Sequence, residues 1–472
     1  MIKPSITVYV LSHNYGNYLS QAVESVFVQS RTDWELIIID DGSTDDSAAL
    51  AASLQARDPE RVRVVVHEAA LGLQKSANEA LRMARGKYIV RVDADDYLDQ
   101  SALLVLAHHL DTDHEAALVY PGYVYVDEQG NQLGVEHRWR IGDDTLVLDQ
   151  PAHGAVTMVR KRVLKAIGGY DEANDRQDGH ELWLKVVNRY KVLQVETPLF
   201  YYRQHGASLS GDRTQLLDAR AKIKRALVER AAGAVAPTIV AVVGAKNTYA
   251  DMPNVVLNPI AGRPLIDYTL DAALAVTTLD LVIVSTDDQA VVDYCAEHYP
   301  TVLARVRPPE LSSMTVNESD LLRDSVHAVE EMEQWPDIVV SLGVHTPLRT
   351  AEQVQKAIDT LLLYDIDSVI SVHEDQDLYY VHGDRGLEPL NPSMHRQVRV
   401  EREALFAGNG AVRALWRDLL DEPESFKPKV GHILMPRQHG LHIKSPHDAW
   451  LAEQLLMERA SGTPLRPDSW QA

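Results

Sequence analysis

The chain has 472 residues, of which 45% are hydrophobic and 24% are charged, and its formal net charge is −22. This composition is typical of a soluble globular protein, and the length predicts two or three domains. The acidic balance argues against a nucleic-acid-binding surface and against broad adhesion to anionic lipid. It does not exclude a phosphate-bearing ligand, because a bound cation can invert the local field.

A single cysteine, Cys295, excludes an intrachain disulfide and a cysteine-based zinc site. We expect it to pack as a small apolar side chain. The first residues lack the basic segment and long apolar core of a signal peptide, and no apolar run approaches the ~20 residues that span a bilayer. We therefore expect a cytoplasmic protein, which partners could bring to the inner face of the cytoplasmic membrane.

The first part of the chain alternates between strand-like and helix-like segments. Continuous Val and Ile runs separated by helices predict a parallel sheet that is covered on both faces. In such sheets, ligands bind beyond the carboxyl ends of the strands. The predicted strands are residues 6–12, 34–43, 61–68 and 87–96, and the predicted helices are residues 18–30, 45–57, 71–86 and 99–111.

Residues 215–237 read as one charged, alanine-rich helix, which we interpret as a connector. A second alternation of strands and helices follows, from residue 238 to residue 374. We therefore predict an α/β protein with two Rossmann-like nucleotide-binding domains. The predicted bounds are residues 1–214 for the first domain, 215–236 for a helical linker and 237–472 for the second domain.

Three polar clusters, "SHN", "DDGSTD" and "DADD", follow predicted strands at the carboxyl edge of the first sheet. Asp40 and Asp41 end one strand and are candidate ligand groups. Turn and cap chemistry alone accounts for Asp45 and Asp46. In "DADD", Asp93 and Asp95 are two residues apart, so in an extended chain their side chains would point the same way.

Two carboxylates on one side of a strand suit Mg²⁺ or Mn²⁺ that holds a nucleotide diphosphate. The competing interpretation is that the acids merely begin a helix, where negative charge complements the helix dipole. That interpretation explains Asp96 and Asp99 but not Asp93.

Four motifs occur in order along the first domain: "PSITVYVLSHNYGNYLSQAVESVFVQS", "WELIIIDDGSTDDS", "GLQKSANEAL" and "GKYIVRVDADD". Through them the chain resembles family 2 glycosyltransferases of the GT-A fold, and four spaced motifs are more specific than a lone DxD. The resemblance implies sugar transfer from a nucleotide-diphosphate donor to a glycan or protein-linked acceptor, usually with inversion. It implies nucleotide contacts from Ser12, Asn14, Asp40, Asp41 and Asp93, and a DxD metal pair of Asp93 and Asp95.

The segment "DRQDGHELWLKV" is similar to the motif that carries the general base in this family. Asp178 is the candidate base, with His180 and Glu181 as alternatives, and a structural acid at a helix start is a competing interpretation of Asp178. The segment "PLFYYRQHGASLS" resembles the family's "YR-x-H-x-x-S" pattern. It implies that His205 lies near the diphosphate or metal, although a lone histidine is often structural.

The second domain resembles CMP-sialic acid synthetases, which are sugar cytidylyltransferases, through pieces such as "NPIAGRPLIDYTLDAAL", "LVIVSTDDQAVVDY" and "SPHDAWLAEQLL". Its phosphate loop departs from the family, because Asn247 and Thr248 replace paired glycines. His442 and Lys444 stand where the family places two metal-binding aspartates, and a protonated ammonium repels a metal ion. We therefore expect this domain to have lost cytidylyl transfer and to bind another ligand, position the acceptor or support a homo-oligomer.

Three functions remain open from the sequence. The first is a metal-dependent glycosyltransferase of bacterial surface-glycan assembly, with no nucleic-acid partner. The second is a bifunctional enzyme that also makes a CMP-nonulosonic acid from CTP. The third is a non-catalytic scaffold that binds nucleotide sugars, which the intact DxD disfavours.

Overall fold

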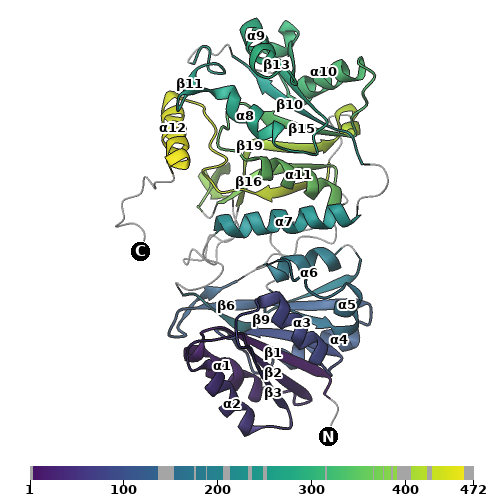
Figure 1. Ribbon diagram of the computed structural model, residues 1–472, viewed down its shortest axis with the longest axis vertical. Helices are drawn as coiled ribbons and strands as arrows, with labels where there is room; N and C mark the ends of the chain where they lie inside the picture. The colour runs from purple at the N-terminus through teal and green to yellow at the C-terminus, as the bar shows by residue number, and fades with distance from the viewer. Residues whose placement is uncertain are drawn as a thin grey trace. The chain divides into compact units, whose positions relative to one another are not determined.

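The computed structural model describes residues 4–136, 154–174, 177–187, 189–205, 213–231, 236–247, 252–313, 316–364, 366–375, 377–383, 386–390, 405–422 and 428–461. The chain forms two compact units, Met1–Arg220 with Gln376–Leu405 and Ala221–Asp375 with Phe406–Ala472. Each unit is a layered α/β structure with helices against a sheet (Figure 1), so the predicted fold class is confirmed.

The sheet of the first unit has the strand order β3-β2-β1-β4-β8-β6-β9-β5, and β7 pairs with β6. The predicted parallel pairing is confirmed for β1 to β4, whereas β8 runs antiparallel to β4 and β6. The sheet is therefore mixed, because β8 fills the space between β4 and β6 in the opposite direction. The strands are β1 (Ile6–Ser12), β2 (Trp34–Asp40), β3 (Val62–Val66), β4 (Tyr88–Asp93), β5 (Tyr97–Leu98), β6 (Ala116–Val126), β7 (Gln132–Val135), β8 (Met158–Arg160) and β9 (Lys191–Arg203).

Helices cover both faces of this sheet, as the continuous apolar strands predict. Even-numbered side chains of β1, such as Val8, enter one core, and Tyr9 enters the other. One core contains α1 (Gly16–Phe27), α2 (Ser47–Arg57) and α4 (Ala102–Thr112). The other contains α3 (Leu73–Met83), α5 (Lys161–Ala166) and α6 (Asp178–Val186).

Strand register determines where the polar clusters lie. Ser12, at the end of β1, is paired with Asp40 at the end of β2. On the other side of β1, Leu11 is paired with Asp93 at the end of β4. Because these three strands are parallel, their carboxyl ends share one edge of the sheet, and the predicted clusters meet there.

The second unit has a seven-stranded sheet of order β14-β13-β10-β15-β19-β16-β20. A short ribbon of β17 (Tyr380–Gly383) with β18 (Gly386–Pro389) lies in the segment Gln376–Leu405, which belongs to the first unit. The strands of the second unit's sheet are β10 (Ile239–Ala245), β13 (Leu281–Thr286), β14 (Leu303–Val306), β15 (Ile338–Gly343), β16 (Ser368–Asp375), β19 (Leu405–Trp416) and β20 (Val430–Leu434), and a short ribbon of this unit pairs β11 (Pro259–Ile260) with β12 (Arg263–Pro264). Its helices are α8 (Leu265–Leu274), α9 (Gln289–His298), α10 (Glu318–Glu330), α11 (Ala351–Leu363) and α12 (Pro446–Ser461), with short 3₁₀ turns at Pro309–Ser312 and Arg417–Asp421.

The predicted connector is helical, and α7 spans Arg213–Ala231. The division between the two compact units falls inside this helix, after Arg220. In its second half, Lys224 is buried and its Nζ donates to Oγ1 of Thr360 on α11 at 3.0 Å. Arg225 pairs with Asp359 of the same helix at 3.3 Å. This half of α7 therefore packs as part of the second unit, which composition alone did not show.

Cys295 is buried in the apolar core of the second unit, as predicted, and burial followed by the charge of Asp267 raises the pKa of its thiol to about 11.

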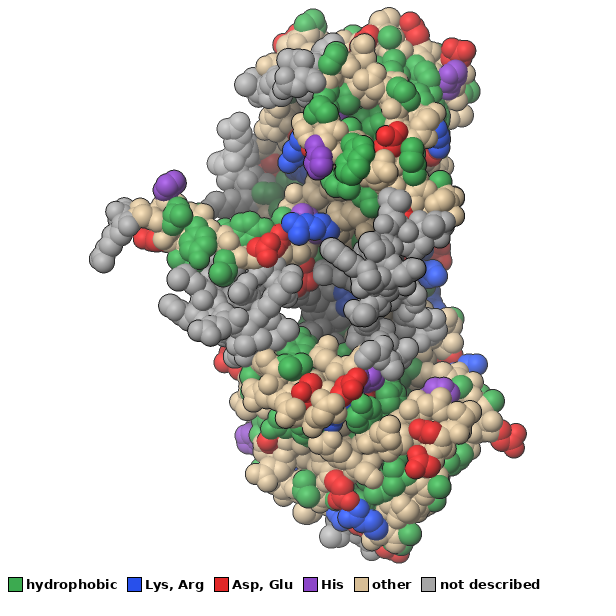
Figure 2. All heavy atoms as spheres, turned by 90° about the vertical axis from the view of Figure 1, so that its left-hand side faces the viewer, with side chains coloured by type: hydrophobic (Ala, Val, Ile, Leu, Met, Phe, Trp, Pro, Cys, Tyr) green, Lys and Arg blue, Asp and Glu red, His purple; other side chains and the backbone are tan. Residues whose placement is uncertain are grey.

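Figure 2 shows acidic, basic and hydrophobic side chains interspersed over the described part of the face that it draws. Within the described residues, no helix has both the length and the apolar character that a membrane crossing requires.

The turn after β2 yields a test of how the polar edge is built. Gly42 has φ +68°, and a Cβ there would lie 2.5 Å from the backbone carbon of Ala69 and the nitrogen of Ala70. We expect Gly42→Ala to lower the free energy of unfolding by roughly 2–4 kcal/mol, because left-handed strain and a backbone clash add together. Urea unfolding of the full chain measures this loss.

Gly168→Ala is the matched control, since Gly168 has φ +83° and a Cβ added there would meet no atom within 4 Å. It should lose only the strain of about 1 kcal/mol. Equal losses in the two variants would contradict a close approach of the residue 69–70 backbone to Gly42.

Candidate active site

The loops after β1 and β2 are joined by Asn14, which lies at φ 60°. Its Oδ1 accepts a hydrogen bond from the backbone N–H of Thr44 at 2.8 Å, and its own N–H donates to Oγ of Ser43 at 2.9 Å. Ser43 in turn donates from Oγ to Oδ1 of Asp40 at 2.5 Å. Asn14 and Asp40, both predicted from the sequence, thus belong to one hydrogen-bonded network at the sheet edge.

Asp41 has both carboxylate oxygens occupied. Oδ1 accepts from the N–H of Leu71 at 2.8 Å and lies 2.7 Å from Nδ1 of His67, and Oδ2 accepts from the N–H of Gly72 at 2.8 Å. The other ring nitrogen of His67 lies 2.8 Å from Oε2 of Glu79. Asp41 therefore holds the backbone of residues 71–72 against the end of β2.

The titration of this cluster follows from these contacts. Burial alone would raise the pKa of the Asp41 carboxyl, but hydrogen bonds from Leu71, His67 and Gly72 hold it below its usual value. Burial alone would lower the pKa of His67, but its bonds to Asp41 and Glu79 raise it above its usual value. His67 and Glu79 were missed by sequence reasoning, since nothing in their spacing indicates that they meet Asp41.

Ser12 ends β1 and is 1% exposed. Within the part of the chain that the structure describes, its Oγ has no hydrogen-bond partner. Burial of a hydroxyl without a hydrogen-bond partner lowers the stability of the folded state by about 1–3 kcal/mol, so such a group indicates a bound molecule or a functional role.

The "DADD" segment differs from the sequence expectation in two respects. β4 ends at Asp93 and a turn follows, in which the N–H of Asp96 donates to the carbonyl of Asp93 at 3.0 Å. The predicted alternation of Asp93 and Asp95 along an extended strand is therefore wrong, and a turn positions Asp95 instead.

The predicted helix-start role of Asp96 is also wrong. Asp96 is 1% exposed, precedes β5 and accepts a hydrogen bond from the backbone N–H of Arg203 on β9 at 3.0 Å. Burial, and then the charges of Asp95 and Asp93, raise the pKa of its carboxyl well above the usual value. Asp99 does serve the next helix, because its Oδ1 accepts from the N–H and Oγ of Ser101.

Each DxD carboxylate has a cationic or imidazole neighbour. Arg91 Nε lies 2.7 Å from Oδ1 of Asp93, and His205 Nε2 lies 2.9 Å from Oδ2 of Asp95. Strand β9 ends at Arg203, two residues before His205, so the β5–β9 pairing delivers this histidine to the acids. The structure therefore brings His205 into contact with Asp95, whereas Asp93, at the end of β4, pairs with Arg91.

Aromatic side chains pack around His205. Tyr18 stacks on its ring at 5.6 Å and Tyr15 meets it edge-on at 5.8 Å. Burial, followed by the charges of Asp95 and Asp93, raises the pKa of Tyr15 well above its usual value. The phenol of Tyr15 is thus close enough to the acids to experience their field, although no sequence pattern singles it out.

Arg203 joins several segments of the site. Its guanidinium donates to the backbone carbonyls of Asp95, Asp127 and Glu128 and to Oε1 of Gln21. It also lies over the ring of Tyr18, with 4.7 Å from Cζ to the ring centroid. Buried arginine that bonds to backbone carbonyls fixes loop geometry, so Arg203 positions the turn that carries Asp95.

The three candidates for the general base lie at the start of α6. Asp178 is the first residue of the helix, and its side chain lies outside what the structure describes. His180 and Glu181 are 1% and 2% exposed. Glu181 accepts from the N–H of Asp171 and forms an ion pair with Lys185. The carboxylate of Glu181 is therefore already engaged in local structure.

The acids at the edge have the chemistry of metal donors. Carboxylate oxygens with an imidazole nitrogen are a donor set that Mn²⁺ accepts, and side-chain exposures of 27% for Asp93 and 13% for Asp95 leave both within reach of a ligand. Within the described residues, no group of three or more His, Cys, Asp or Glu side chains is already arranged around a metal position. Asp93, Asp95 and His205 thus have the chemistry of metal donors, and an ion at this edge would need further ligands, such as oxygens of a bound diphosphate.

The corresponding region of the second unit has a different character. His345 and His442 lie with ring centroids 5.6 Å apart. Burial, and then the neighbouring His442, lowers the pKa of His345 to about 4. Burial, and then the charge of Lys444, lowers the pKa of His442. Neutral imidazoles and an exposed lysine thus occupy the place where the resemblance implies acids.

The His67 contacts predict a pH-dependent stability. His67 has a raised pKa in the folded state, so its stabilising effect is fully present below the ordinary value of 6.5 and is lost as pH rises through the folded value. We expect His67→Asn to lower the free energy of unfolding by about 1–3 kcal/mol near pH ~6 and by less near pH ~9. Urea unfolding at the two pH values measures the difference.

His108→Asn is the control for this prediction. His108 is exposed on α4 and, among the described residues, makes no ion pair with a carboxylate. It should show no such pH dependence. A loss in His67→Asn that is the same at both pH values would contradict a charged His67 between Asp41 and Glu79.

Two parts of the chain match known protein families. Residues 7–164 match the family described as Glycosyl transferase family 2, and residues 251–383 match the family described as Cytidylyltransferase. Chondroitin synthase of Escherichia coli is 28% identical over 183 residues, which are 39% of this chain and 26% of that protein. An uncharacterized glycosyltransferase of Methanocaldococcus jannaschii is 26% identical over 209 residues, which are 43% of this chain and 72% of that protein.

The chain spans about a quarter of the length of the first two curated relatives that it matches. Among solved structures, residues 1–349 of S. aureus TarS with UDP-GlcNAc align at a TM-score of 0.40 and 18% identity, over 46% of this chain and 66% of that chain. CMP:2-keto-3-deoxy-manno-octonic acid synthetase with CTP aligns at a TM-score of 0.36 and 17% identity, over 47% of this chain and 99% of that chain. The chain therefore contains a family 2 glycosyltransferase domain, and a cytidylyltransferase-like domain follows it.

Proposed function

We propose that the first unit is a metal-dependent, inverting glycosyltransferase that moves a sugar from a nucleotide-diphosphate donor to a glycan or protein-linked acceptor. The observation that carries this proposal is the meeting of Asp40, Asp93, Asp95 and His205 at one carboxyl edge of the sheet. Sheets of this kind bind ligands at that edge, and the match to family 2 covers the strands that form it.

The donor nucleoside would lie against the ends of β1 and β2. Ser12 provides a buried hydroxyl, and the Asn14–Asp40 network orders the two loops. Asp41 would contribute indirectly, since its oxygens already hold residues 71–72 and His67. A pocket whose walls are fixed before binding costs less conformational entropy when the nucleotide binds.

Asp93, Asp95 and His205 would hold Mn²⁺ or Mg²⁺ together with the donor diphosphate, and Asp95 would be the residue in direct contact. Such an ion, when bound, stabilises the negative charge that develops on the departing diphosphate. The contacts of Arg91 with Asp93 and of His205 with Asp95 support this role, because they keep both carboxylates in place at the edge.

The carboxylate of Asp178 would act as general base. It takes the proton from an acceptor hydroxyl, whose oxygen forms a bond to the anomeric carbon on the face opposite the diphosphate. The anomeric carbon–oxygen bond to the diphosphate breaks at the same time, and the nucleoside diphosphate leaves with the electron pair. The engagement of Glu181 with Asp171 and Lys185 favours Asp178 over this alternative.

The biological setting follows from what the relatives are named for. Chondroitin synthase and hyaluronan synthase are among the proteins that match the first part of the chain. By analogy, this protein would assemble a bacterial surface glycan at the inner face of the cytoplasmic membrane. Its acceptor would then be a growing glycan or glycoconjugate.

The second unit would support this reaction without transferring a cytidylyl group. The pKa of His442 is lowered next to Lys444, so neither side chain supplies the negative charge that holds magnesium triphosphate. Asn247 is occupied as well, because it donates to Asp287 and Asp288 and accepts from the N–H of Val256. A role in acceptor positioning or in a homo-oligomer therefore fits better than synthesis of a CMP-nonulosonic acid.

Removing the central acid tests the metal proposal. We expect Asp95→Ala to lower transfer or donor hydrolysis at least ~100-fold, because the site loses a metal ligand and several kcal/mol of charge stabilisation. Release of nucleoside diphosphate from a panel of nucleotide sugars with Mn²⁺ measures the rate. Asp46→Asn, an exposed acid beside the same loops, should retain full activity. Full activity of the unmodified protein in excess chelator would disprove metal dependence.

The base assignment has a separate test. We expect Asp178→Asn to lower kcat by roughly 10²–10⁴-fold while leaving the melting temperature unchanged. Glu181→Gln should instead lower the melting temperature, since it breaks the contacts with Asp171 and Lys185. An active Asp178→Asn enzyme, combined with a stable but inactive Glu181→Gln or His180→Gln variant, would move the base to that residue.

A further inference from the structure

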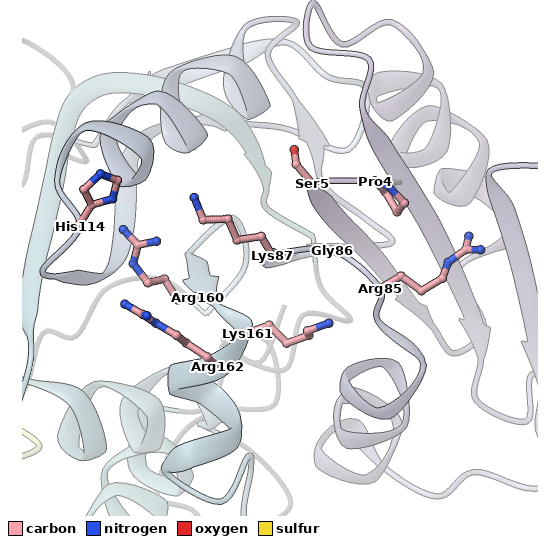
Figure 3. A pocket seen from close by; sticks show the side chains of 9 residues that line it. All are labelled: Pro4, Ser5, Arg85, Gly86, Lys87, His114, Arg160, Lys161 and Arg162. Carbon is pink, nitrogen blue, oxygen red and sulfur yellow. The ribbon is translucent and has the colours of Figure 1, made fainter. Parts of the chain in front are cut away.

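A second cavity, of about 640 Å³, opens at the other edge of the first unit's sheet. Its nine lining residues come from the start of β1, the loop before β4, the loop before β6 and the β8–α5 junction (Figure 3). They are Pro4, Ser5, Arg85, Gly86, Lys87, His114, Arg160, Lys161 and Arg162. Nothing in the proposed glycosyl transfer uses these residues.

The lining carries five lysine or arginine side chains and one histidine, and none of the nine described lining residues is acidic. In Figure 3 the charged ends of Lys87, Arg160 and Arg162 lie on one side of the pocket, near His114. Such a concentration of positive charge is unusual in a chain whose net charge is −22. A concave surface of one sign focuses the field and attracts ions of the opposite sign.

The charge of Arg160 is buried and has no carboxylate partner among the described residues. The side chain is 3% exposed, and its guanidinium donates to the carbonyls of Ala116 at 2.6 Å, Leu110 at 2.5 Å and Asp113 at 2.9 Å. Carbonyl dipoles fix its position but do not cancel its charge. An uncompensated buried cation favours an anion in the adjoining space.

Two further cations share their acidic partners with other residues. Arg85 lies 2.6 Å from Oε2 of Glu35, which also pairs with Arg63. In the same way, Lys87 Nζ lies 3.0 Å from Oδ1 of Asp111, and Asp111 also pairs with Arg31. Arg31 also pairs with Asp33 at 2.8 Å, so the charges around Asp111 balance. The surplus of positive charge comes from Glu35, which serves both Arg63 and Arg85.

In the described part of the chain, Arg162 and His114 differ from the other basic lining residues in having unbonded side chains. Both are exposed, and within the described residues neither forms a hydrogen bond or an ion pair. A second cavity of about 260 Å³ shares Arg160 and Arg162 with the first and continues toward Tyr190. Glu115 also lines the second cavity, so the basic character is concentrated in the first.

This cavity is separate from the candidate active site. Lys87 lies immediately before β4, and Asp93 is the last residue of that strand. Six strand residues span roughly 20 Å, so the basic cavity and the DxD acids lie at opposite ends of the same strand. One ligand of ordinary size does not reach both.

We infer that this cavity is a second, metal-independent binding site for a ligand that carries two or more phosphate charges. A planar guanidinium group can bind two phosphate oxygens at once, which suits the side chain of Arg162, unbonded within the described ranges. Arg160 contributes the field of its buried charge, because its N–H groups already donate to carbonyls and to Tyr88. The volume lies in the range of about 300–1,000 Å³ that discrete small ligands occupy, which favours a soluble diphosphate or phosphate ester over a flat bilayer surface. The inference does not rest on the proposed glycosyl transfer.

Titration calorimetry with inorganic pyrophosphate tests the site in the full-length protein. EDTA is present throughout, so that metal-assisted binding at Asp93 and Asp95 does not contribute. We expect binding that weakens as NaCl rises and that falls at least ~10-fold in Arg162→Glu, since a contact cation is replaced by an anion. Arg82→Glu, an exposed arginine on α3 outside the cavity lining, should bind like the unmodified protein.

The outcomes separate the sources of phosphate. Pyrophosphate binding that Arg162→Glu abolishes and Arg82→Glu retains supports a soluble ligand. Binding of phosphatidylglycerol vesicles with the same residue dependence, but no binding of pyrophosphate, would place the phosphate on a lipid headgroup and overturn the soluble ligand. Equal affinity in the two variants, or binding of an acidic polysaccharide alone, would overturn the inference.

Because Arg162 is exposed and unbonded among the described residues, its variants should fold, and an unchanged melting temperature confirms this. Asp95→Ala should retain pyrophosphate binding in EDTA while it loses sugar transfer. A failure of the proposed transferase activity would leave this binding unaffected, and a failure of pyrophosphate binding would leave the transferase proposal intact.

Discussion

Parallel pairing of β1, β2 and β4 brings Asp40 and Asp93 to one edge of a sheet, where the charges of Asp93 and Asp95 act on the buried Asp96 and, after burial itself, raise its pKa. The surrounding structure compensates for this negative charge with specific partners. Arg91 pairs with Asp93, His205 contacts Asp95, and Arg203 fixes the turn between them through backbone carbonyls. A cluster of carboxylates that is held in place in this way costs stability and is retained where it binds something.

The basic cavity at the opposite edge follows from the same topology. In a parallel sheet the amino ends of the strands are also adjacent, so the loops before β1 and β4 meet the end of β8. The two edges therefore lie at opposite ends of the same strands. This separation underlies the proposal of a cation-bound diphosphate at one edge and of a bare anion at the other.

The cytidylyltransferase-like domain combines the core of its fold with a different set of polar residues around the expected phosphate site. Its strands retain the apolar Val and Ile runs that form the core, such as Ile239–Ala245. The polar positions around its expected phosphate site now serve structure, as Asn247 does through Asp287 and Asp288. Core residues are constrained by packing and site residues by the ligand, so the site residues can change while the core pattern is kept.

The sequence by itself determined the α/β alternation, the helical connector and the polar clusters at strand ends, because apolar periodicity and turn residues are local properties. It also nominated Asp95 and His205, which the tertiary structure brings into contact, and Asp93, which pairs with Arg91. Only the tertiary structure decided three features: the antiparallel direction of β8, the burial of Asp96 with its hydrogen bond from the N–H of Arg203, and the contact of Asp41 with His67. These depend on contacts between residues 26 to 107 positions apart, and no local pattern encodes which distant side chain completes a buried charge.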